Sequence, residues 1–308
     1  MFFYRPLALI CGLLLAASAL FAQGSFPQSA PSAPRDAAYA FTNATVYVDY
    51  QTRLEGATLV IRKGKVEACG LKVVAPKDAV VVNCAGRTIY PAFIDLCAPD
   101  YGLVVPKSDD PGQQQRPQAF SDKPGAFAWN EALRPEFDAA DYFNPDAKPA
   151  AEWRKLGFGA ALAYRPDGIS RGTGAFVLLG DNRAHDMLLR PRAANLLSFR
   201  KGSSSQDYPS SLMGCIALLR QTYLDARWYQ SEGYKTEANL SLEAWNAAQG
   251  LPQIFEAEDK LDVLRIHRLG QEPHHRPTGG YFLRQHGRPS GFAWSLDPYH
   301  TARPSSCL

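Results

Sequence analysis

Short apolar and β-branched runs separated by glycine turns dominate residues 39–95. The segment AFTNATVYVD comes first, and TRLEGATLVIRKGKVEACG follows with a turn at Lys63-Gly64. The segment AVVVNCAGRTIYPAFIDL then contains a second turn at Ala85-Gly86. Runs of this length that are bounded by glycine are typical of β-strands. The pattern therefore predicts a small sheet or β-sandwich.

From residue 149 onward, helical and strand-like patterns alternate. The segment PAAEWRKLGFG predicts a helix with a glycine stop, and AALAY and GAFVLLG predict short buried strands. Residues 209–232 carry the strongest helical pattern. One face of that helix is apolar, with Ile216, Leu219, Tyr223 and Ala226. SLEAWNAAQG and EDKLDVLRIHRLG predict two more helices around a strand at LPQIFEA, so we expect βα units around a parallel sheet or barrel.

The first residues have the pattern of an export signal. Arg5 precedes an apolar run at residues 7–21, and small residues at 17–19 and 22 offer cleavage sites. The run is about 15 residues long, whereas a membrane-spanning helix needs roughly 20. We interpret residues 1–22 as a signal peptide, with an uncleaved membrane anchor as the alternative. We therefore expect an exported bacterial protein, periplasmic or secreted, with no membrane span after cleavage.

The net charge and the spacing of the cysteines argue against several classes of protein. The formal net charge of +3 provides no large basic field, so nucleic acid is not expected as a partner. The six cysteines include no C-x-x-C, which argues against a disulfide framework or a zinc knuckle. Cys69 and Cys84 lie in the same small β region. They either form a disulfide or remain two free thiols.

Two segments lack regular patterning. Residues 95–144 include KSDDPGQQQRPQAFSDKPGAF and predict a long loop, either functional or disordered, and residues 23–38 predict a flexible leader. Residues 266–308 lose all periodicity and hold every histidine except His185. They are either a metal-binding tail or an aberrant end, from a shifted reading frame or disorder. We adopt the second interpretation.

One phrase is more specific than the strand pattern around it. Gly86, Pro91, Phe93, Ile94 and Asp95 match, in order, the phrase G-x-x-x-x-P-G-F-I-D-x-H-x-H. Members of the amidohydrolase superfamily typically carry this sequence motif at their first barrel strand. The hairpins that precede it here also resemble the N-terminal region of those proteins. The later segments EWRKLGFGAALAYRPDGISRGTGAFVLLG and FRKGSSSQDYPSSLMGCIALLRQTYLDARWY resemble a subgroup of large exported bacterial amidohydrolase-like proteins.

The resemblance implies an α/β fold in two parts. A small β-sandwich (residues 39–88) would precede an incomplete (β/α)8 barrel of the TIM type (residues 89–265), and the aberrant tail (residues 266–308) would follow. A truncated or frameshifted copy of such a protein is therefore expected. Members of the superfamily use zinc or another divalent metal to hydrolyse C–N bonds in cyclic amides or peptide-like substrates.

The metal-binding residues of the superfamily are replaced at the first strand. Active members bind the metal through two histidines at its C-terminal end, and the aligned positions here hold Cys97 and Pro99. Proline has no donor atom, and one thiolate cannot hold a zinc ion that needs three or four ligands. We therefore predict no metal site and no cofactor in this segment.

Other candidate site residues are weaker. Asp95 is expected to position the strand rather than act as an acid, and Asp100 and Tyr101 stand where a substrate contact is possible. Ser198 and Lys201 match the S-x-x-K nucleophile motif without its partner motifs. Ser210 or Ser211 is expected to cap the long helix, whose free amides are a weaker candidate for holding an anion.

Three functional hypotheses remain. The first is the metal-dependent hydrolysis of the superfamily, acting on a small-molecule or peptide substrate. The second is a non-catalytic scaffold module of a larger exported protein that binds a peptide or glycan through residues 100–144 and the strand ends. The third is a truncated product that does not fold stably. The oligomeric state stays open.

Overall fold

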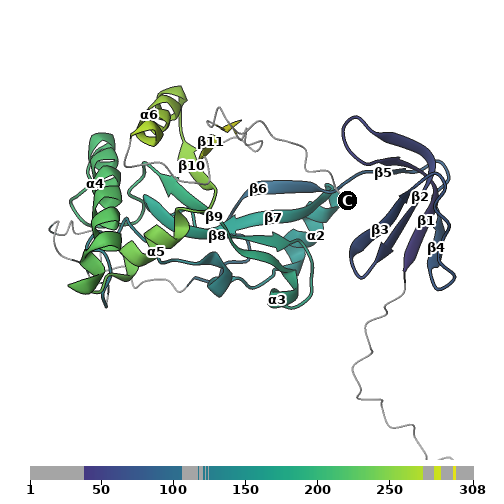
Figure 1. Ribbon diagram of the computed structural model, residues 1–308, viewed down its shortest axis with the longest axis horizontal. Helices are drawn as coiled ribbons and strands as arrows, with labels where there is room; N and C mark the ends of the chain where they lie inside the picture. The colour runs from purple at the N-terminus through teal and green to yellow at the C-terminus, as the bar shows by residue number, and fades with distance from the viewer. Residues whose placement is uncertain are drawn as a thin grey trace, which may run out of the picture. The chain divides into compact units, whose positions relative to one another are not determined.

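A computed structural model describes residues 38–105, 117, 121, 123 and 125–272, and the backbone of residues 281–285 and 294–295. The predicted signal peptide and leader, much of the predicted loop and most of the predicted tail lie outside these residues. In the described part, no helix combines the length and apolar character needed to cross a membrane. The chain divides into two compact units, Met1–Pro91 and Ala92–Leu308, each visible in Figure 1.

The first unit is a five-stranded mixed sheet. Its strands are β1 (Tyr39–Tyr47), β2 (Arg53–Arg62), β3 (Lys65–Gly70), β4 (Val80–Asn83) and β5 (Thr88–Ile89). The antiparallel hairpin β2–β3 turns at Lys63 and Gly64, both with positive φ, as the sequence predicted. β4 and β5 pair one after the other along β1, parallel to it, so β1 lies at the centre of the sheet.

Cys69 and Cys84 are free thiols that take part in the same apolar cluster of the first unit. Ala44, Val46 and Ala57 form the rest of its buried core together with Cys84. Burial raises the pKa of the Cys69 thiol, because the thiolate loses hydration. Both residues therefore behave as small apolar side chains, and the disulfide alternative is absent from the structure.

The second unit is built on a seven-stranded sheet with the order β12-β11-β10-β9-β8-β7-β6. Its strands are β6 (Phe93–Pro99), β7 (Phe158–Tyr164), β8 (Ser170–Leu178), β9 (Leu188–Ser198), β10 (Gln253–Ala257), β11 (Tyr281–Gln285) and β12 (Trp294–Ser295). Its helices are η1 (Ala139–Tyr142), α2 (Ala147–Lys155), α3 (Ala184–Met187), α4 (Leu212–Ser231), η2 (Gly233–Lys235), α5 (Leu240–Ala248) and α6 (Lys260–Gln271).

The expected succession of parallel βα units holds only in part. β6 and β7 are parallel, as are β9, β10 and β11, but β8 is antiparallel to both of its neighbours. The reason is the connection from β7 to β8, residues 165–169, which is too short for a helical crossover. The result is an open half-barrel in which β8 and the edge strand β12 run antiparallel to their neighbours.

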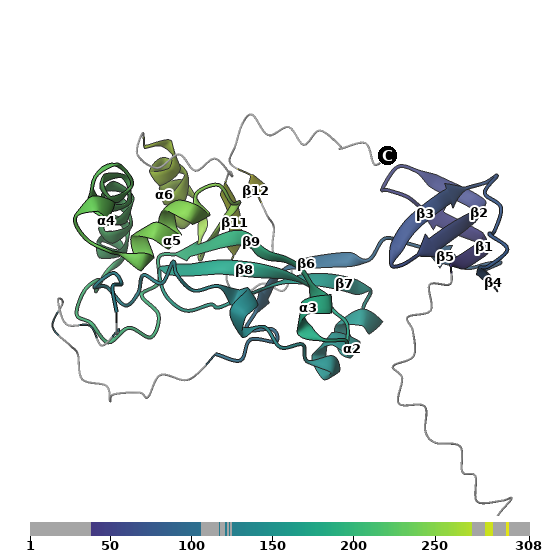
Figure 2. The ribbon, with the colours of Figure 1, turned by 60° about the horizontal axis from the view of Figure 1, so that its bottom comes forward.

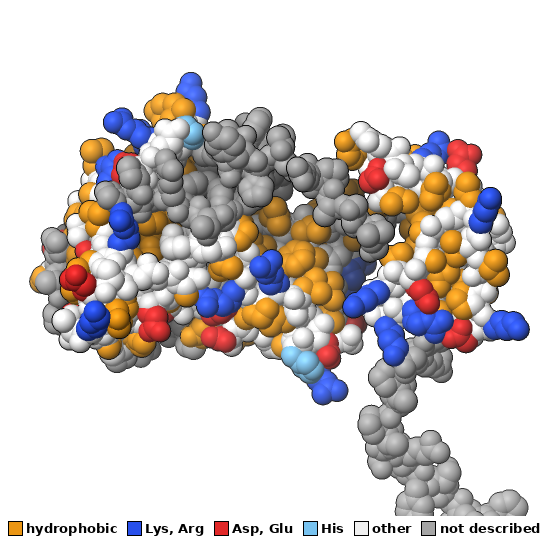
Figure 3. All heavy atoms as spheres, viewed as in Figure 1, with side chains coloured by type: hydrophobic (Ala, Val, Ile, Leu, Met, Phe, Trp, Pro, Cys, Tyr) orange, Lys and Arg blue, Asp and Glu red, His pale blue; other side chains and the backbone are white. Residues whose placement is uncertain are grey.

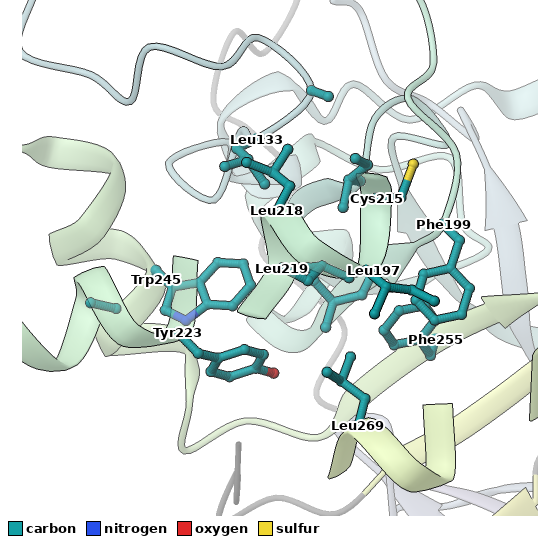
Figure 4. Close-up of a cluster of buried hydrophobic side chains, with 14 of the residues drawn as sticks. Leu133, Leu197, Phe199, Cys215, Leu218, Leu219, Tyr223, Trp245, Phe255 and Leu269 are labelled. Carbon is teal, nitrogen blue, oxygen red and sulfur yellow. The ribbon is translucent and has the colours of Figure 1, made fainter. Parts of the chain in front are cut away.

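Two apolar clusters attach helices to this sheet. In the first, strand residues such as Leu197 and Phe255 pack against Leu219 of α4 and Trp245 of α5 (Figure 4). The four apolar residues predicted for one face of the long helix are all buried there, which confirms that prediction. The second cluster packs β7 and β8 against α2 and α3. Figure 2 shows α4, α5 and α6 grouped at one end of the sheet and α2 and α3 at the other.

The predicted boundary after Arg265 falls inside α6. That helix continues to Gln271, and its residues Ile266 and Leu269 are fully buried in the larger cluster. Composition changes at this point of the sequence, but the helical spacing of apolar residues continues through it. On the face shown in Figure 3, acidic and basic side chains are interspersed over the described part of the second unit.

Candidate functional site

The C-terminal end of β6 is irregular where the superfamily places its metal ligands. The backbone N–H of Cys97 donates to Oδ1 of Asp95 at 2.8 Å, and the pairing with β7 shifts register between Asp95 and Ala98. Asp95 therefore stabilises a local bulge. This contact agrees with a positioning role for Asp95.

The side chains at this position do not fit a metal ion. Cys97 is half-buried and in no disulfide, and Pro99 contributes no donor. Across the residues that the structure describes, no group of three or more His, Cys, Asp or Glu is placed to hold an ion. His185 lies on α3, exposed and paired with Asp186 at 3.1 Å. A zinc site at the end of β6 would thus have one thiolate at most.

Asp100 directly follows β6, and its carboxylate interacts electrostatically with Arg165, Asp167 and Arg171. Its backbone N–H donates to the carbonyl oxygen of Tyr164 at 2.9 Å, and its φ of 55° is left-handed, which aspartate tolerates. The carboxylate accepts no hydrogen bond in the described part of the chain. Partial desolvation raises its pKa, while the charges of Arg165 and Arg171 act in the opposite direction.

The carboxylate of Asp167 is held by Ser203 and Arg165. It accepts hydrogen bonds from the backbone N–H and the hydroxyl of Ser203, both at 2.7 Å, and pairs with Arg165 at 2.5 Å. Burial acts to raise its pKa, but the bonds from Ser203 and the nearby Arg165 and Arg134 outweigh burial, so the pKa is lowered. This contact fixes residues 200–204 against the end of β7.

Arg171 and Glu256 form a buried ion pair at the carboxyl ends of β9 and β10. Arg171 also donates through Nε to the carbonyl oxygen of Gly168 at 3.2 Å, and that oxygen accepts the Ser198 hydroxyl at 2.9 Å. Ser198 pairs in register with Glu256 across the sheet. The interior position at these strand ends is therefore filled by a salt bridge and its hydrogen bonds.

The nucleophile motif is not assembled. The Ser198 hydroxyl donates to Gly168 and accepts from the backbone N–H of Arg200, whereas the Lys201 ammonium donates to the carbonyl oxygen of Gln206 at 2.8 Å. Lys201 is thus not positioned to activate Ser198. Strand β8 contains most of the segment GAFVLLG, which was predicted to be a buried strand, and it begins four residues earlier, at Ser170.

Part of the predicted long loop is ordered beside this site. Gln206 is fully buried, accepts from the backbone N–H of Glu131 at 2.8 Å and donates to the carbonyl oxygen of Trp129 at 2.9 Å. Asn130, also fully buried, donates to the carbonyl oxygen of Tyr208 at 2.9 Å. These bonds attach residues 129–131 to the segment that leads into α4.

A pocket of about 530 Å³ lies at the carboxyl ends of β9 and β10. Lys201 and Cys215 line it on the side of α4, and Glu258, Asp259 and Asp262 line it on the side of α6. Ser211 also lines it and caps α4 by accepting from the backbone N–H of Gly214 at 3.2 Å. This contact decides between the two predicted caps in favour of Ser211.

Sequence reasoning missed most of the charged residues gathered here. Arg165, Asp167, Arg171 and Glu256 come from three different strand ends, and no short motif contains all of them. The available signal was the position of Arg165 and Asp167 directly after a predicted strand, since sheet sites collect at carboxyl ends.

No family model and no curated protein matches this chain. Among solved structures, an amidohydrolase from Thermotoga maritima is similar at 22% identity with a TM-score of 0.61, covering 80% of this chain and 64% of that chain. A second amidohydrolase structure, at 13% identity over 76% of this chain and 59% of that chain, has a TM-score of 0.33, which supports no conclusion. The chain thus spans less than two thirds of the Thermotoga protein, and the likeness shows an amidohydrolase-type fold.

Proposed function

We propose that this chain is an amidohydrolase-like protein whose half-barrel binds a polar, peptide-like ligand and does not itself hold the first-strand metal. The buried pair of Arg171 and Glu256 is the observation that carries the proposal. A carboxylate that is bound by an arginine is not available as a metal ligand, and Cys97 with Pro99 does not replace it.

The ligand would bind where one charged group lacks a protein partner. Asp167 is bound by Arg165 and Ser203, and Glu256 is bound by Arg171, whereas the exposed Asp100 carboxylate accepts no hydrogen bond within the described residues. Asp100 would accept an amide or ammonium N–H of the ligand. Export to the periplasm or beyond, and derivation from a longer parent protein, belong to the same proposal.

The alternative is the hydrolysis known for the superfamily, cleavage of a C–N bond in a cyclic amide or peptide-like substrate with a divalent metal. The amidohydrolase-type fold favours it. The donors at β6 do not, so any metal would need ligands from elsewhere in the whole protein.

The test compares the full chain with Asp100→Asn and with the control Asp186→Asn, an exposed acid on α3. Melting temperatures are recorded with panels of dipeptides and cyclic amides, because a ligand that binds only the native state raises Tm. Elemental analysis and mass spectrometry of the mixtures report metal and hydrolysis products.

We expect at least one ligand to raise Tm for the unmodified chain and Asp186→Asn but not for Asp100→Asn, without product and without stoichiometric metal. Near-stoichiometric zinc together with product would establish the hydrolase alternative. A ligand-induced rise that is unchanged in Asp100→Asn, or no rise with any compound, would also reject the proposal.

A further inference from the structure

One carboxylate beside the Arg165–Asp167 ion pair has no partner of opposite charge. Asp100 lies within electrostatic range of both members of that pair, yet its carboxylate makes no hydrogen bond or ion pair with a described residue. Arg165 is engaged elsewhere, because it pairs with Asp167 at 2.5 Å and its guanidinium lies 5.6 Å from the centre of the Phe137 ring. Asp100 therefore remains available to a positively charged group of a ligand.

A positive charge near the same ion pair is also uncompensated. The half-buried Arg134 donates through Nε to the backbone carbonyl oxygen of Glu131 at 3.1 Å, and its two terminal nitrogens contact no acceptor among the described residues. Burial and the charge of Arg134 lower the pKa of Arg165, although Asp167 and Asp100 act in the opposite direction. Because like charges at close range repel, an anion bound at Arg134 would relieve an unfavourable interaction.

The backbone holds both uncompensated residues at the same edge of the sheet. The N–H of Asp100 donates to the carbonyl oxygen of Tyr164 at the end of β7, and the N–H of Arg134 donates to that of Ser170 at the start of β8, both at 2.9 Å. Since β8 runs antiparallel to β7, the start of β8 lies beside the end of β7. No ion pair joins Asp100 to Arg134, so each charge can bind one end of a bridging molecule.

We propose that the ligand of the half-barrel is a zwitterion, an amino acid or a short peptide with both ends free. Its ammonium group would bind Asp100, and its carboxylate would bind Arg134. The inference rests on the proposed function, which assigns an N–H group of the ligand to Asp100, and it adds the group at the other end. A guanidinium binds a carboxylate through two parallel hydrogen bonds, for which the terminal nitrogens of Arg134 are the donors.

The test titrates ligands into the full chain by calorimetry at constant ionic strength, so that general salt screening stays equal. Alanine, dialanine and trialanine are titrated first, which reports the length that spans the two residues. The tightest of the three is then compared with its N-acetyl derivative, which lacks the ammonium group, and with its C-terminal amide, which lacks the carboxylate.

Three variants alter the two binding residues one at a time. Arg134→Gln removes the guanidinium, Arg134→Lys keeps the positive charge without the two-bond geometry, and Asp100→Asn removes the carboxylate. The controls are Arg53→Gln, at an exposed arginine of the first unit paired with Glu55, and Asp186→Asn on α3. Thermal melts followed by circular dichroism establish that each variant is folded.

We expect each derivative to bind the unmodified chain and both controls about tenfold or more weakly than the zwitterion, because each derivative lacks one charge-assisted contact. In Arg134→Gln, amidation of the ligand should no longer weaken binding, whereas acetylation still should. In Asp100→Asn the reverse should hold, and Arg134→Lys should keep part of the preference for the carboxylate. Changing ligand and protein together in this way assigns each end of the ligand separately.

Equal affinity of the unmodified chain for the zwitterion and both derivatives would overturn the inference, and this comparison needs no variant. If Asp100→Asn then weakened all three equally, the proposed function would stand without the zwitterion. Losses from amidation and acetylation that are the same in every variant would also overturn the inference. Binding of none of these compounds would do so as well, and the panel of cyclic amides would then decide the proposed function.

Discussion

Arg171 on β8 and Glu256 on β10 form an ion pair across the intervening strand β9. The side chains of Arg171 and Glu256 are 3% and 6% exposed, so both charged groups are shielded from solvent. Desolvation of two charges is expensive, and it is offset only while each remains paired and hydrogen-bonded. The pair therefore specifies how the reversed strand β8 and the parallel strands β9 and β10 come together.

Replacing one partner of the Arg171–Glu256 pair should lower the free energy of unfolding far more than replacing both. We expect Arg171→Met to lower the free energy of unfolding by roughly 3–5 kcal/mol, because Glu256 would be left buried and unpaired. The double variant Arg171→Met/Glu256→Leu should lose less than Arg171→Met alone. Urea denaturation followed by tryptophan fluorescence measures both, since all five tryptophans belong to the second unit.

Arg192→Met is the control for that comparison. Arg192 pairs with Asp138 at 3.6 Å and is 42% exposed, so its removal should cost less than about 1 kcal/mol. Equal losses for Arg171→Met and Arg192→Met would show that the buried pair contributes no more than a surface contact.

Gly202 should tolerate no side chain, because it lies against Asp167. Its φ is 71°, and an added Cβ would lie 2.1 Å from Oδ1 of Asp167 and 2.5 Å from the backbone nitrogen of Gly168. We expect the steric overlap in Gly202→Ala to lower the free energy of unfolding by about 1–3 kcal/mol, in addition to the loss from backbone strain. Gly157→Ala is the matched control, since its φ is also positive but its nearest neighbour is 3.4 Å away.

The same denaturation measurement compares the two glycine variants. Backbone strain alone should cost about 1 kcal/mol at either position. A result in which Gly157→Ala is as destabilising as Gly202→Ala would mean that contact with Asp167 adds nothing.

The N-terminal cap of α4 gives a prediction about a single side-chain hydroxyl. Ser211 accepts the backbone N–H of Gly214, and Ser210 does not cap the helix. We expect Ser211→Ala to lower the free energy of unfolding by about 1 kcal/mol and Ser210→Ala to have a much smaller effect. Urea denaturation of both variants checks this, and the reverse order would place the helix start one residue earlier.

The elements with strong local signals were predictable from the sequence. The helix at residues 209–232 and its buried face follow from apolar spacing, and the structure has α4 at Leu212–Ser231. The β2–β3 turn follows from Lys63-Gly64 in the same way. Both depend on residues close together in the chain, for which periodicity and turn chemistry are sufficient.

The charged site was not predictable, because it depends on the sheet topology. Arg171 meets Glu256 only because β8 runs antiparallel beside β9, and the alternation of strands and helices predicted parallel neighbours. The break assigned after Arg265 came from composition, whereas burial of Ile266 and Leu269 carries α6 beyond it. At β8 the sheet topology outweighed the local pattern, whereas at α6 the predicted helix EDKLDVLRIHRLG already extended past Arg265 and only the boundary drawn from composition differs.

Asp167 and Asp100 should make opposite contributions to the dependence of stability on pH. The native pKa of Asp167 is lowered, so its carboxylate stabilises the fold above its unfolded pKa of about 3.9. That contribution is lost as pH falls through the lowered native pKa. Asp167→Asn should therefore be less stable than the unmodified chain at pH 7, and the difference should shrink below about pH 4.

The native pKa of Asp100 is raised, so the sign reverses. Stability should fall as pH rises from its unfolded pKa of about 3.9 through the raised native pKa, because the native state binds the proton more tightly. Asp100→Asn should equal or exceed the unmodified chain in stability at pH 7, and asparagine keeps the left-handed backbone accessible. Urea denaturation from pH 3 to pH 7 measures both variants. Parallel curves for Asp100→Asn and Asp167→Asn would show that the surroundings of the two carboxylates do not differ in the way that the structure indicates.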